Sequence, residues 1–523
     1  MSKPTSHLYL KLLPLLAVTS ALYGCAAGPD FKRPSAPTAS AYSPQGLPDS
    51  TSSTATQSEV QHFSPTQSID ADWWKVFQSP AINSLIERAF KNNPTIESAQ
   101  AALKQAQENV VAQQGFFYPS VGVSYAASRN KLAGNMGGNS PGLQADGTLI
   151  QTYANPAGPV YNGPAYYNFH TSQLSINYVP DLFGLNRRQV ESLQAQAEAQ
   201  EMQLAATYIT LASNVVAAAL QEASLRAQLV AVKKFIADNQ EMLAILQKQF
   251  ALGFVSQLEV SNQVSLLAQS EQSLPPLQKQ LEQTRNLMRA LVGNTPDQDV
   301  SETFELNQIH LPQNLPLTLP SQIVEQRPDV RAAEAQLHSA TALYGVAIAN
   351  RLPQFSITGT IGGMATNPAW LYEAGGQFFN LSTNVAQTIF DGGTLKAKSR
   401  AAQQAVTQAA ADYRSTVIAA LQNVADTLAA IQADADILRS ASNAEQANLS
   451  VLEITRQQYQ QGFVSYQTLL LAEQNYQLTT LTLAQAQAAR LGDTAALYQA
   501  LGGGWWQKDK SDQPASSAVH AQQ

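Results

Sequence analysis

The residue types that most often catalyse reactions or bind metals are scattered in this chain. The histidines lack the short spacing that two metal ligands on one helix or loop need; they include His62, His170, His310 and His338. The sequence has no nucleophile elbow and no phosphate-binding glycine loop. The three glycines at 502–504 follow a helical pattern and are predicted to end that helix. The pattern predicts no enzyme, no cofactor and no metal site.

One further motif could be mistaken for an active site. Arg327-Pro328-Asp329 places a proline where helices commonly begin and an acid that suits a helix N-terminus. We interpret it as a helix start.

Chemical modification is indicated at Cys25, the only cysteine of the chain. It follows a short apolar run at 12–22, too short to span a bilayer as a helix. The run ends in Leu22-Tyr23-Gly24-Cys25, which resembles a bacterial lipoprotein signal. We expect 1–24 to be a signal peptide and Cys25 to carry the lipid (palmitate), because a lone cysteine cannot form an intrachain disulfide. An ordinary secretory signal with an incidental cysteine is the alternative.

Two long helices must position any site in this chain. The windows 185–252 and 394–461 contain no Gly or Pro over 68 residues each, and a helix of that length spans about 100 Å. Apolar residues in the first window recur every ~3.5 residues, which is typical of a coiled coil, and only Glu222 and Asn239 break the seam. The second window has a weaker seam in the same register. Helices of a soluble bundle are the alternative, although bundle helices are rarely this long.

The same four residues follow each window. They are Gly253-Phe254-Val255-Ser256 and Gly462-Phe463-Val464-Ser465, and the helical pattern resumes after each copy. Gly suits a helix end and Ser suits the next N-cap, so we expect two helical hairpins with tight tips. The return arms are predicted at 257–292 and 466–501, the first of them kinked or broken by Pro275-Pro276.

Ahead of each long helix lie segments that alternate apolar and small polar residues, which predicts strands. They fall near 120–129, 167–180, 354–363 and 378–390. Strands of ~10 residues with one apolar face suit a membrane β-barrel, although a soluble sheet would alternate in the same way. Four strands cannot close a barrel, and open edges do not occur in lipid, so several chains would have to contribute.

The chain is therefore expected to consist of two repeats. Charged residues make up only 13% of the chain, well below the ~25% typical of soluble domains. The net charge of −7 gives no basic surface for nucleic acid. The predicted parts are a lipid-anchored tether at 25–70, repeat 1 at 71–294, a connector at 295–320, repeat 2 at 321–506 and a disordered tail at 507–523.

Motifs along the whole mature chain resemble the outer membrane factors, the TolC/OprM-like family of efflux channels, and among them the NodT-like lipoproteins. The matching motifs are Cys25-Ala26-Ala27-Gly28-Pro29-Asp30, Trp73-Trp74, Asn92-Asn93-Pro94, Asp181-Leu182-Phe183-Gly184, Arg327-Pro328-Asp329-Val330-Arg331, Phe390-Asp391-Gly392-Gly393 and Ala500-Leu501-Gly502-Gly503-Gly504-Trp505.

The resemblance implies a mostly α fold in a homotrimer, whose four strands per chain make a 12-stranded barrel in the outer membrane. The helical hairpins would form a periplasmic α-barrel. The protein would be the passive, gated conduit of a tripartite pump exporting drugs or other toxic small molecules. Its partners would be a periplasmic membrane-fusion adaptor, an inner-membrane pump of the resistance-nodulation-division type and outer-membrane lipid. The alternatives are a channel for one-step protein secretion and a lipid-anchored periplasmic coiled-coil scaffold without a pore.

The resemblance also indicates gate residues at the inner end of the conduit. The tips 253–256 and 462–465 would close it. Glu259 keeps the acid that rings the pore in relatives, whereas Leu471 stands where relatives often carry Asp and would give an apolar constriction instead. Tyr459 stands where relatives use a tyrosine to tie neighbouring helices.

Overall fold

The computed structural model describes residues 26–131 and 166–505, with gaps at 36, 38, 40, 45, 47–48, 52–59 and 65–68. Cys25, the expected signal peptide and the expected tail lie outside the described residues. The chain divides into two compact units. Unit 1 comprises the described residues of 1–32, 105–197 and 336–410, and unit 2 those of 33–104, 198–335 and 411–523.

The same order of elements occurs twice. The first copy consists of α2 (Pro80–Asn92), α3 (Pro94–Gln114), β2 (Ser120–Lys131), β3 (Tyr166–Tyr178), α4 (Leu185–Ala251) and α5 (Gln257–Leu291). The second consists of α6 (Pro320–Gln326), α7 (Pro328–Ala349), β5 (Gln354–Ala365), β6 (Gln377–Ala386), α8 (Thr394–Gln460) and α9 (Tyr466–Ala500). Pro328 opens α7, and Gly502, Gly503 and Gly504 follow α9 with positive φ angles. Both motifs therefore have the helix-terminal roles that the sequence predicted.

The long helices α4 and α8 contain 67 residues each, and the return helices α5 and α9 contain 35 each. By length and composition, α4 is the one described helix that could cross a membrane, but half of its most apolar stretch is buried within the protein. Burial of this kind is also found in core helices of soluble bundles.

The expected break at Pro275-Pro276 is wrong, because α5 runs through both prolines. Each proline removes one backbone donor and leaves the carbonyl four residues earlier without its helical partner. Those carbonyls belong to Glu271 and Gln272, which are exposed like the prolines themselves. Water can therefore solvate both carbonyls, and the helix continues.

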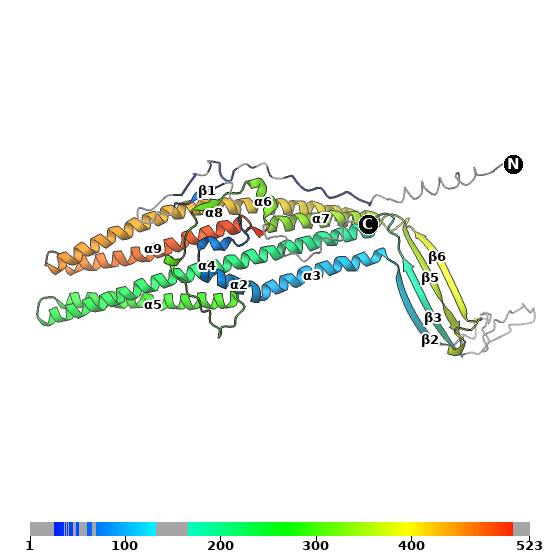
Figure 1. Ribbon diagram of the computed structural model, residues 1–523, viewed down its shortest axis with the longest axis horizontal. Coiled ribbons are helices and arrows are strands. Elements are labelled where there is room, and N and C mark those ends of the chain that lie inside the picture. Colours follow the sequence, from blue (N-terminus) through cyan, green and yellow to red (C-terminus); the bar gives the residue numbers. More distant parts are fainter. Residues whose placement is uncertain are drawn as a thin grey trace, which may run out of the picture. The chain divides into compact units, whose positions relative to one another are not determined.

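The strands of unit 1 form one antiparallel sheet in the order β2-β3-β5-β6 (Figure 1). Each repeat contributes one hairpin, and β3 pairs with β5 to join them. Within the described residues, β2 and β6 are therefore the edge strands. The last strand ends at Ala386, before the predicted boundary, because Ala386 already pairs with Gln354, the first residue of β5. Asp391 then accepts hydrogen bonds from the backbone N–H groups of Gly393 and Leu395 at the start of α8.

The register gives the sheet two different faces. Val123, Leu174, Ile361 and Phe379 lie side by side on one face, across all four strands. Gly122, Ser175, Thr360 and Asn380 lie side by side on the other face. The apolar face is open: Val123 is 78% exposed and Phe379 82% exposed. An exposed apolar face opposite a small polar face is the pattern of a membrane barrel wall.

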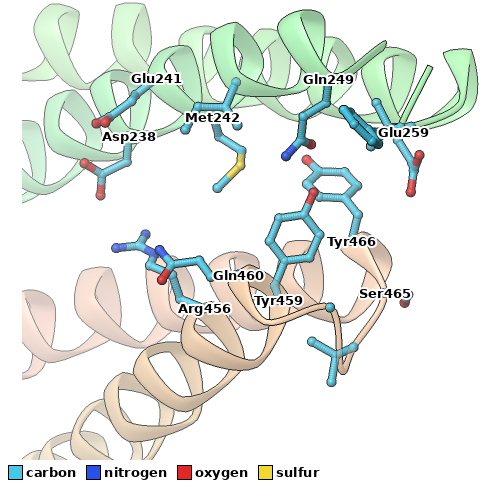
Figure 2. Close-up of a pocket in the computed structure, with 15 residues that line it drawn as sticks. Asp238, Glu241, Met242, Gln249, Glu259, Arg456, Tyr459, Gln460, Ser465 and Tyr466 are labelled. Atoms are coloured by element: carbon cyan, nitrogen blue, oxygen red, sulfur yellow. The ribbon is translucent and has the colours of Figure 1, made fainter. Parts of the chain in front are cut away.

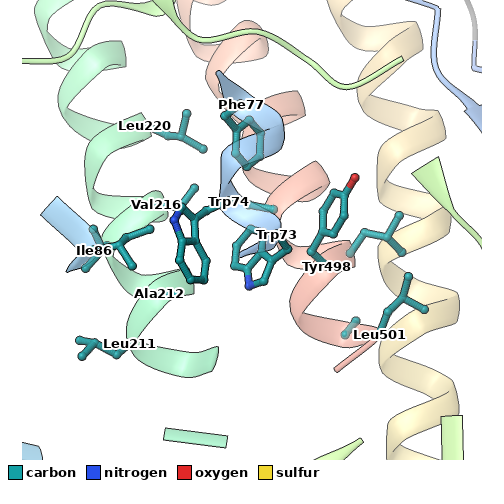
Figure 3. Close-up of a cluster of buried hydrophobic side chains, with 14 of the residues drawn as sticks. Trp73, Trp74, Phe77, Ile86, Leu211, Ala212, Val216, Leu220, Tyr498 and Leu501 are labelled. Atoms are coloured by element: carbon teal, nitrogen blue, oxygen red, sulfur yellow. The ribbon is translucent and has the colours of Figure 1, made fainter. Parts of the chain in front are cut away.

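The core of unit 2 is built around a short 3-10 helix, η1 (Trp73–Phe77). Figure 3 shows its aromatic side chains between α4 and α9. Trp73 stacks on Tyr498 with ring centroids 5.6 Å apart, and Trp74 meets Phe90 edge-on at 5.5 Å. Trp73 and Phe77 are almost fully buried. These bulky rings fix the spacing of the helices around them.

Most of the predicted coiled-coil seam lies on the buried side of α4 in unit 2, although its last member, Phe250, is exposed. Both of its polar interruptions have partners. Glu222 is fully buried and lies 2.6 Å from Arg226 and 3.0 Å from Arg285 of α5. Asn239 accepts a 2.9 Å hydrogen bond from Gln263, also on α5. Each interruption therefore ties α4 to its return helix.

The segments expected to be a tether and a connector contact each other in unit 2. β1 (His62–Ser64) pairs in parallel with β4 (Asn314–Pro316). The hydroxyl of Tyr42 donates to the backbone oxygen of Thr318 at 2.6 Å. Thr51, within the same expected tether, is buried. Strand pairing therefore holds these described parts of the expected tether and connector in place.

A pH dependence follows from the seam of α8. Burial, and then the negative charge of Asp493 on α9, raise the pKa of Asp434 from its ordinary value to about 6. Because the folded state binds this proton more tightly than the unfolded chain, stability falls as pH rises through 6 and is regained as pH falls below it. We expect Asp434→Asn to raise the melting temperature of the extracted protein at pH 7.5 and to have little effect at pH 4.

The matched control is Asp436→Asn, because Asp436 is exposed and its ion pair with Arg439 lies at the surface, where such pairs contribute little. Equal melting temperatures for wild type and Asp434→Asn at pH 7.5 would contradict this account of Asp434.

Candidate functional site

The two tips have the same backbone chemistry. Gly253 and Gly462 have φ angles of 80° and 79°, the left-handed conformation that glycine adopts without strain. The next residue, Phe254 or Phe463, donates its N–H back to a carbonyl five residues earlier at 2.9 Å. This hydrogen bond closes the end of the long helix. The repeated sequence therefore encodes a repeated turn.

The return helices begin differently in the two repeats. Glu259 accepts the backbone N–H of Ser256 at 2.7 Å, so its carboxylate caps the first turn of α5. In the second repeat Thr468 stands at this position, with its hydroxyl 3.1 Å from that of Ser465. Glu259 therefore has a structural role that the sequence analysis did not assign.

The two tips of unit 2 enclose a groove of about 550 Å³ between the hairpins. Figure 2 shows side chains from α4 and from α8 projecting toward one another across it. Seven residues predicted at the tips line the groove: Phe254, Val255, Glu259, Tyr459, Gly462, Val464 and Ser465. The structure therefore brings both tips together in one site.

The other predicted tip residues lie outside the groove lining. Gly253, Ser256 and Phe463 belong to the turns themselves, and Phe463 is 76% exposed. Leu471 is half exposed on α9 and does not line the groove. The structure therefore does not bring Leu471 together with the other predicted gate residues.

The groove is acidic. Asp238 and Glu241 of α4 and Glu259 of α5 line it, against one cation, Arg456 of α8 (Figure 2). Arg456 lies 3.3 Å from Glu473 of α9, which is buried. Burial raises the pKa of Glu473, and the nearby guanidinium opposes that shift. The excess of carboxylates favours cationic groups in this groove.

A buried hydrogen-bond chain that the sequence analysis missed joins the two hairpins. The Tyr466 hydroxyl donates to Oε1 of Gln263, and the side-chain amide of Gln263 donates to Asn239 at 2.9 Å. All three residues are nearly or fully buried. Burial raises the pKa of Tyr466, so the phenol stays protonated and able to donate. These hydrogen bonds therefore link α9 to α5 and α4.

Tyr459, the tyrosine that the sequence singled out, supports this contact from the side. Its ring meets that of Tyr466 edge-on, with centroids 5.9 Å apart. Comparison of the repeats could have identified Tyr466, because the residue after Ser256 is Gln257 whereas the residue after Ser465 is Tyr466.

The fold defines a class of protein. Over 92% of this chain and all of its counterpart, the structure superposes on the outer-membrane channel OprN with a TM-score of 0.78 and 25% identity. A sequence model described as outer membrane efflux protein matches residues 85–294 and 319–503. The chain belongs to this family of outer-membrane proteins.

Curated relatives cover nearly the whole chain. The pyoverdine export outer membrane protein OpmQ of Pseudomonas aeruginosa is 26% identical over 83% of this chain and 87% of its own length. The cation efflux system protein CusC of Escherichia coli is 27% identical over 94% of this chain and 99% of its own length. Relatives of similar likeness are thus named for different cargoes.

The hydrogen-bond chain predicts a specific mutant effect. Tyr466→Phe removes the donor and leaves Oε1 of Gln263 buried without its partner, which costs about 1–3 kcal/mol. We expect faster amide hydrogen exchange in the first turns of α5 and α9, with exchange at Trp73 and Phe77 unchanged. Tyr459→Phe, the same change on the neighbouring ring, is the control. Unchanged exchange in Tyr466→Phe would show that the bond does not hold the hairpins together.

Proposed function

We propose that three copies of this chain form the outer-membrane channel of a tripartite efflux pump. The channel is a passive conduit for small molecules. It is opened and closed at the hairpin tips, and the inner-membrane pump supplies the energy. Cys25, which lies outside the described residues, carries the lipid anchor.

The observation that carries this proposal is the sheet of unit 1. Its exposed apolar face suits lipid, its polar face suits a water-filled lumen, and its edge strands β2 and β6 are open within the described chain. Unpaired backbone groups are strongly disfavoured in hydrocarbon. Neighbouring copies that pair β2 with β6 satisfy these groups, and three copies give 12 strands, within the range of membrane barrels.

The tips supply the gate in this proposal. Three copies of Glu259 form a ring of carboxylates that favours cations. The bonds from Tyr466 through Gln263 to Asn239 hold the two hairpins of one chain together at rest. Opening requires these bonds to break or shift.

The partners follow from the same surfaces. We propose that a periplasmic adaptor docks at the tips, where Phe254 and Phe463 are each more than three-quarters exposed beside an acidic groove. A partner with apolar and cationic side chains complements this surface. The inner-membrane pump, of the proton-driven resistance-nodulation-division type, selects the cargo, because relatives of similar likeness are named for different cargoes.

Single-channel conductance in a planar bilayer tests the channel and its gate. We expect wild type to show a small, cation-preferring conductance and Glu259→Gln to lose that preference severalfold. Glutamine keeps an acceptor for the Ser256 N–H, so the helix cap survives and the charge alone is removed. Glu271→Gln, an exposed position on the same helix, is the matched control.

A preference retained in Glu259→Gln would leave the channel intact but place the constriction elsewhere, with Leu471 the next position to test. A well-folded oligomer that conducts no ions, even after the tips are shortened, would contradict the proposed function and favour the scaffold.

A further inference from the structure

The open face of the sheet changes character along the strands. β2 begins soon after α3 ends, and β3 ends shortly before α4 begins, so Lys131 and Tyr166 stand at the end of this hairpin remote from those helices. Near the helices the face carries Val121 and Val123. Farther out come Tyr125 and His170, and at the remote end come Arg129, Lys131 and Tyr166. Along β2 the order is apolar, then aromatic, then basic.

All the basic residues of the four strands lie on this one face. Lys131 is opposite Tyr166, Arg129 opposite Asn168, and His170 opposite Ala127, in the same register that places Val123 opposite Leu174. The sequences of β2, β3, β5 and β6 contain no Asp or Glu. Among the described residues, Arg129 and Lys131 form no ion pair, and both are exposed. The remote end of this face therefore has a local positive charge.

One aromatic ring contacts a cation, and further tyrosines bond to residues of the same face. Nζ of Lys131 lies 5.3 Å from the centre of the Tyr166 ring. The hydroxyl of Tyr125 is 2.8 Å from Nδ1 of His170. The hydroxyl of Tyr372, from the turn between β5 and β6, is 2.7 Å from Oγ of Ser172. Tyrosines at this position are typical of the border between lipid tails and head groups.

We propose that Arg129 and Lys131 bind the phosphate of a lipid head group in the outward-facing leaflet. The proposal rests on the proposed function, in which this face meets lipid and the remote strand ends face outward. Acyl chains pack on Val123 and its neighbours, the tyrosines lie at the interface, and the phosphate reaches the two cations. Arg offers a bidentate fork and Lys a point charge, and both suit a phosphate. The adjoining apolar surface selects a lipid over free phosphate.

Native mass spectrometry of the detergent-extracted oligomer tests the site. The probes are bisphosphorylated lipid A, the same lipid with its phosphates removed, and inorganic phosphate. The test variant is Arg129→Gln/Lys131→Gln. Its control, Lys396→Gln/Lys398→Gln, removes two exposed lysines from the first turns of α8 in the same unit. We expect the test variant to bind the phosphorylated lipid on the order of 10-fold more weakly, since each cation near a membrane surface adds to binding of anionic lipid.

The control variant is expected to bind the lipid as wild type does, and inorganic phosphate is expected not to compete. Equal affinity of wild type and test variant, equal affinity for lipid with and without phosphate, or competition by inorganic phosphate would each overturn the proposal. Measuring conductance distinguishes failure of the lipid-site proposal from failure of the proposed function. A test variant that conducts normally but binds lipid as wild type does overturns only the lipid site, whereas a well-folded wild-type oligomer that conducts no ions, even after the tips are shortened, overturns both.

Discussion

Backbone pairing in the membrane is the constraint on which the rest of this structure depends. An unpaired N–H or C=O in hydrocarbon costs several kcal/mol, and the sheet of unit 1 leaves one side of β2 and one side of β6 unpaired within the described chain. The alternation of apolar and polar side chains across all four strands suits a sheet whose apolar face contacts lipid and whose polar face contacts water. A closed barrel built from several copies pairs the backbone groups of the edge strands and gives each face its suitable surroundings. The copies must therefore assemble for the strands to insert into the membrane.

In unit 2 the buried polar residues of the α4 seam restrict how the helices align. A coiled coil of apolar residues alone tolerates shifts in register, whereas one buried polar residue restricts it. Glu222 and Asn239 each find their partner on α5, at Arg285 and Gln263, so they fix how α4 and α5 align. That alignment sets where the tip falls, and Gln263 then extends the link to Tyr466 of the second hairpin. The alignment of α4 with α5 thus rests on one pair far from the turn, Glu222 with Arg285, and on one close to it, Asn239 with Gln263.

The sequence was sufficient to predict elements encoded by local patterns, and insufficient where a contact joins distant segments. The long helices, the tips and the strands follow from glycine placement, seam spacing and alternation, all of which are local. The pairing of β1 with β4 could not be predicted, because three-residue strands in a segment rich in Ser, Thr and Pro carry no periodic signal. Comparison of the repeats singles out Tyr466, but its hydrogen bond could not be predicted because the partner, Gln263, lies 203 residues earlier. Glu259 was identified as an acid of the gate, but its capping of α5 depends on the geometry of the turn.

The central claim is that the open edges of the sheet pair with each other between copies of the chain. Disulfide cross-linking measures this directly, with cysteine introduced at Ser124 of β2 together with Asn380, Ser382 or Asn384 of β6, in chains extracted from outer membranes. The account predicts that one of these combinations yields covalently linked trimers on a denaturing gel, because β2 of one copy lies beside β6 of the next. Chains that remain monomeric with every combination, while wild type is folded in the membrane, would contradict it.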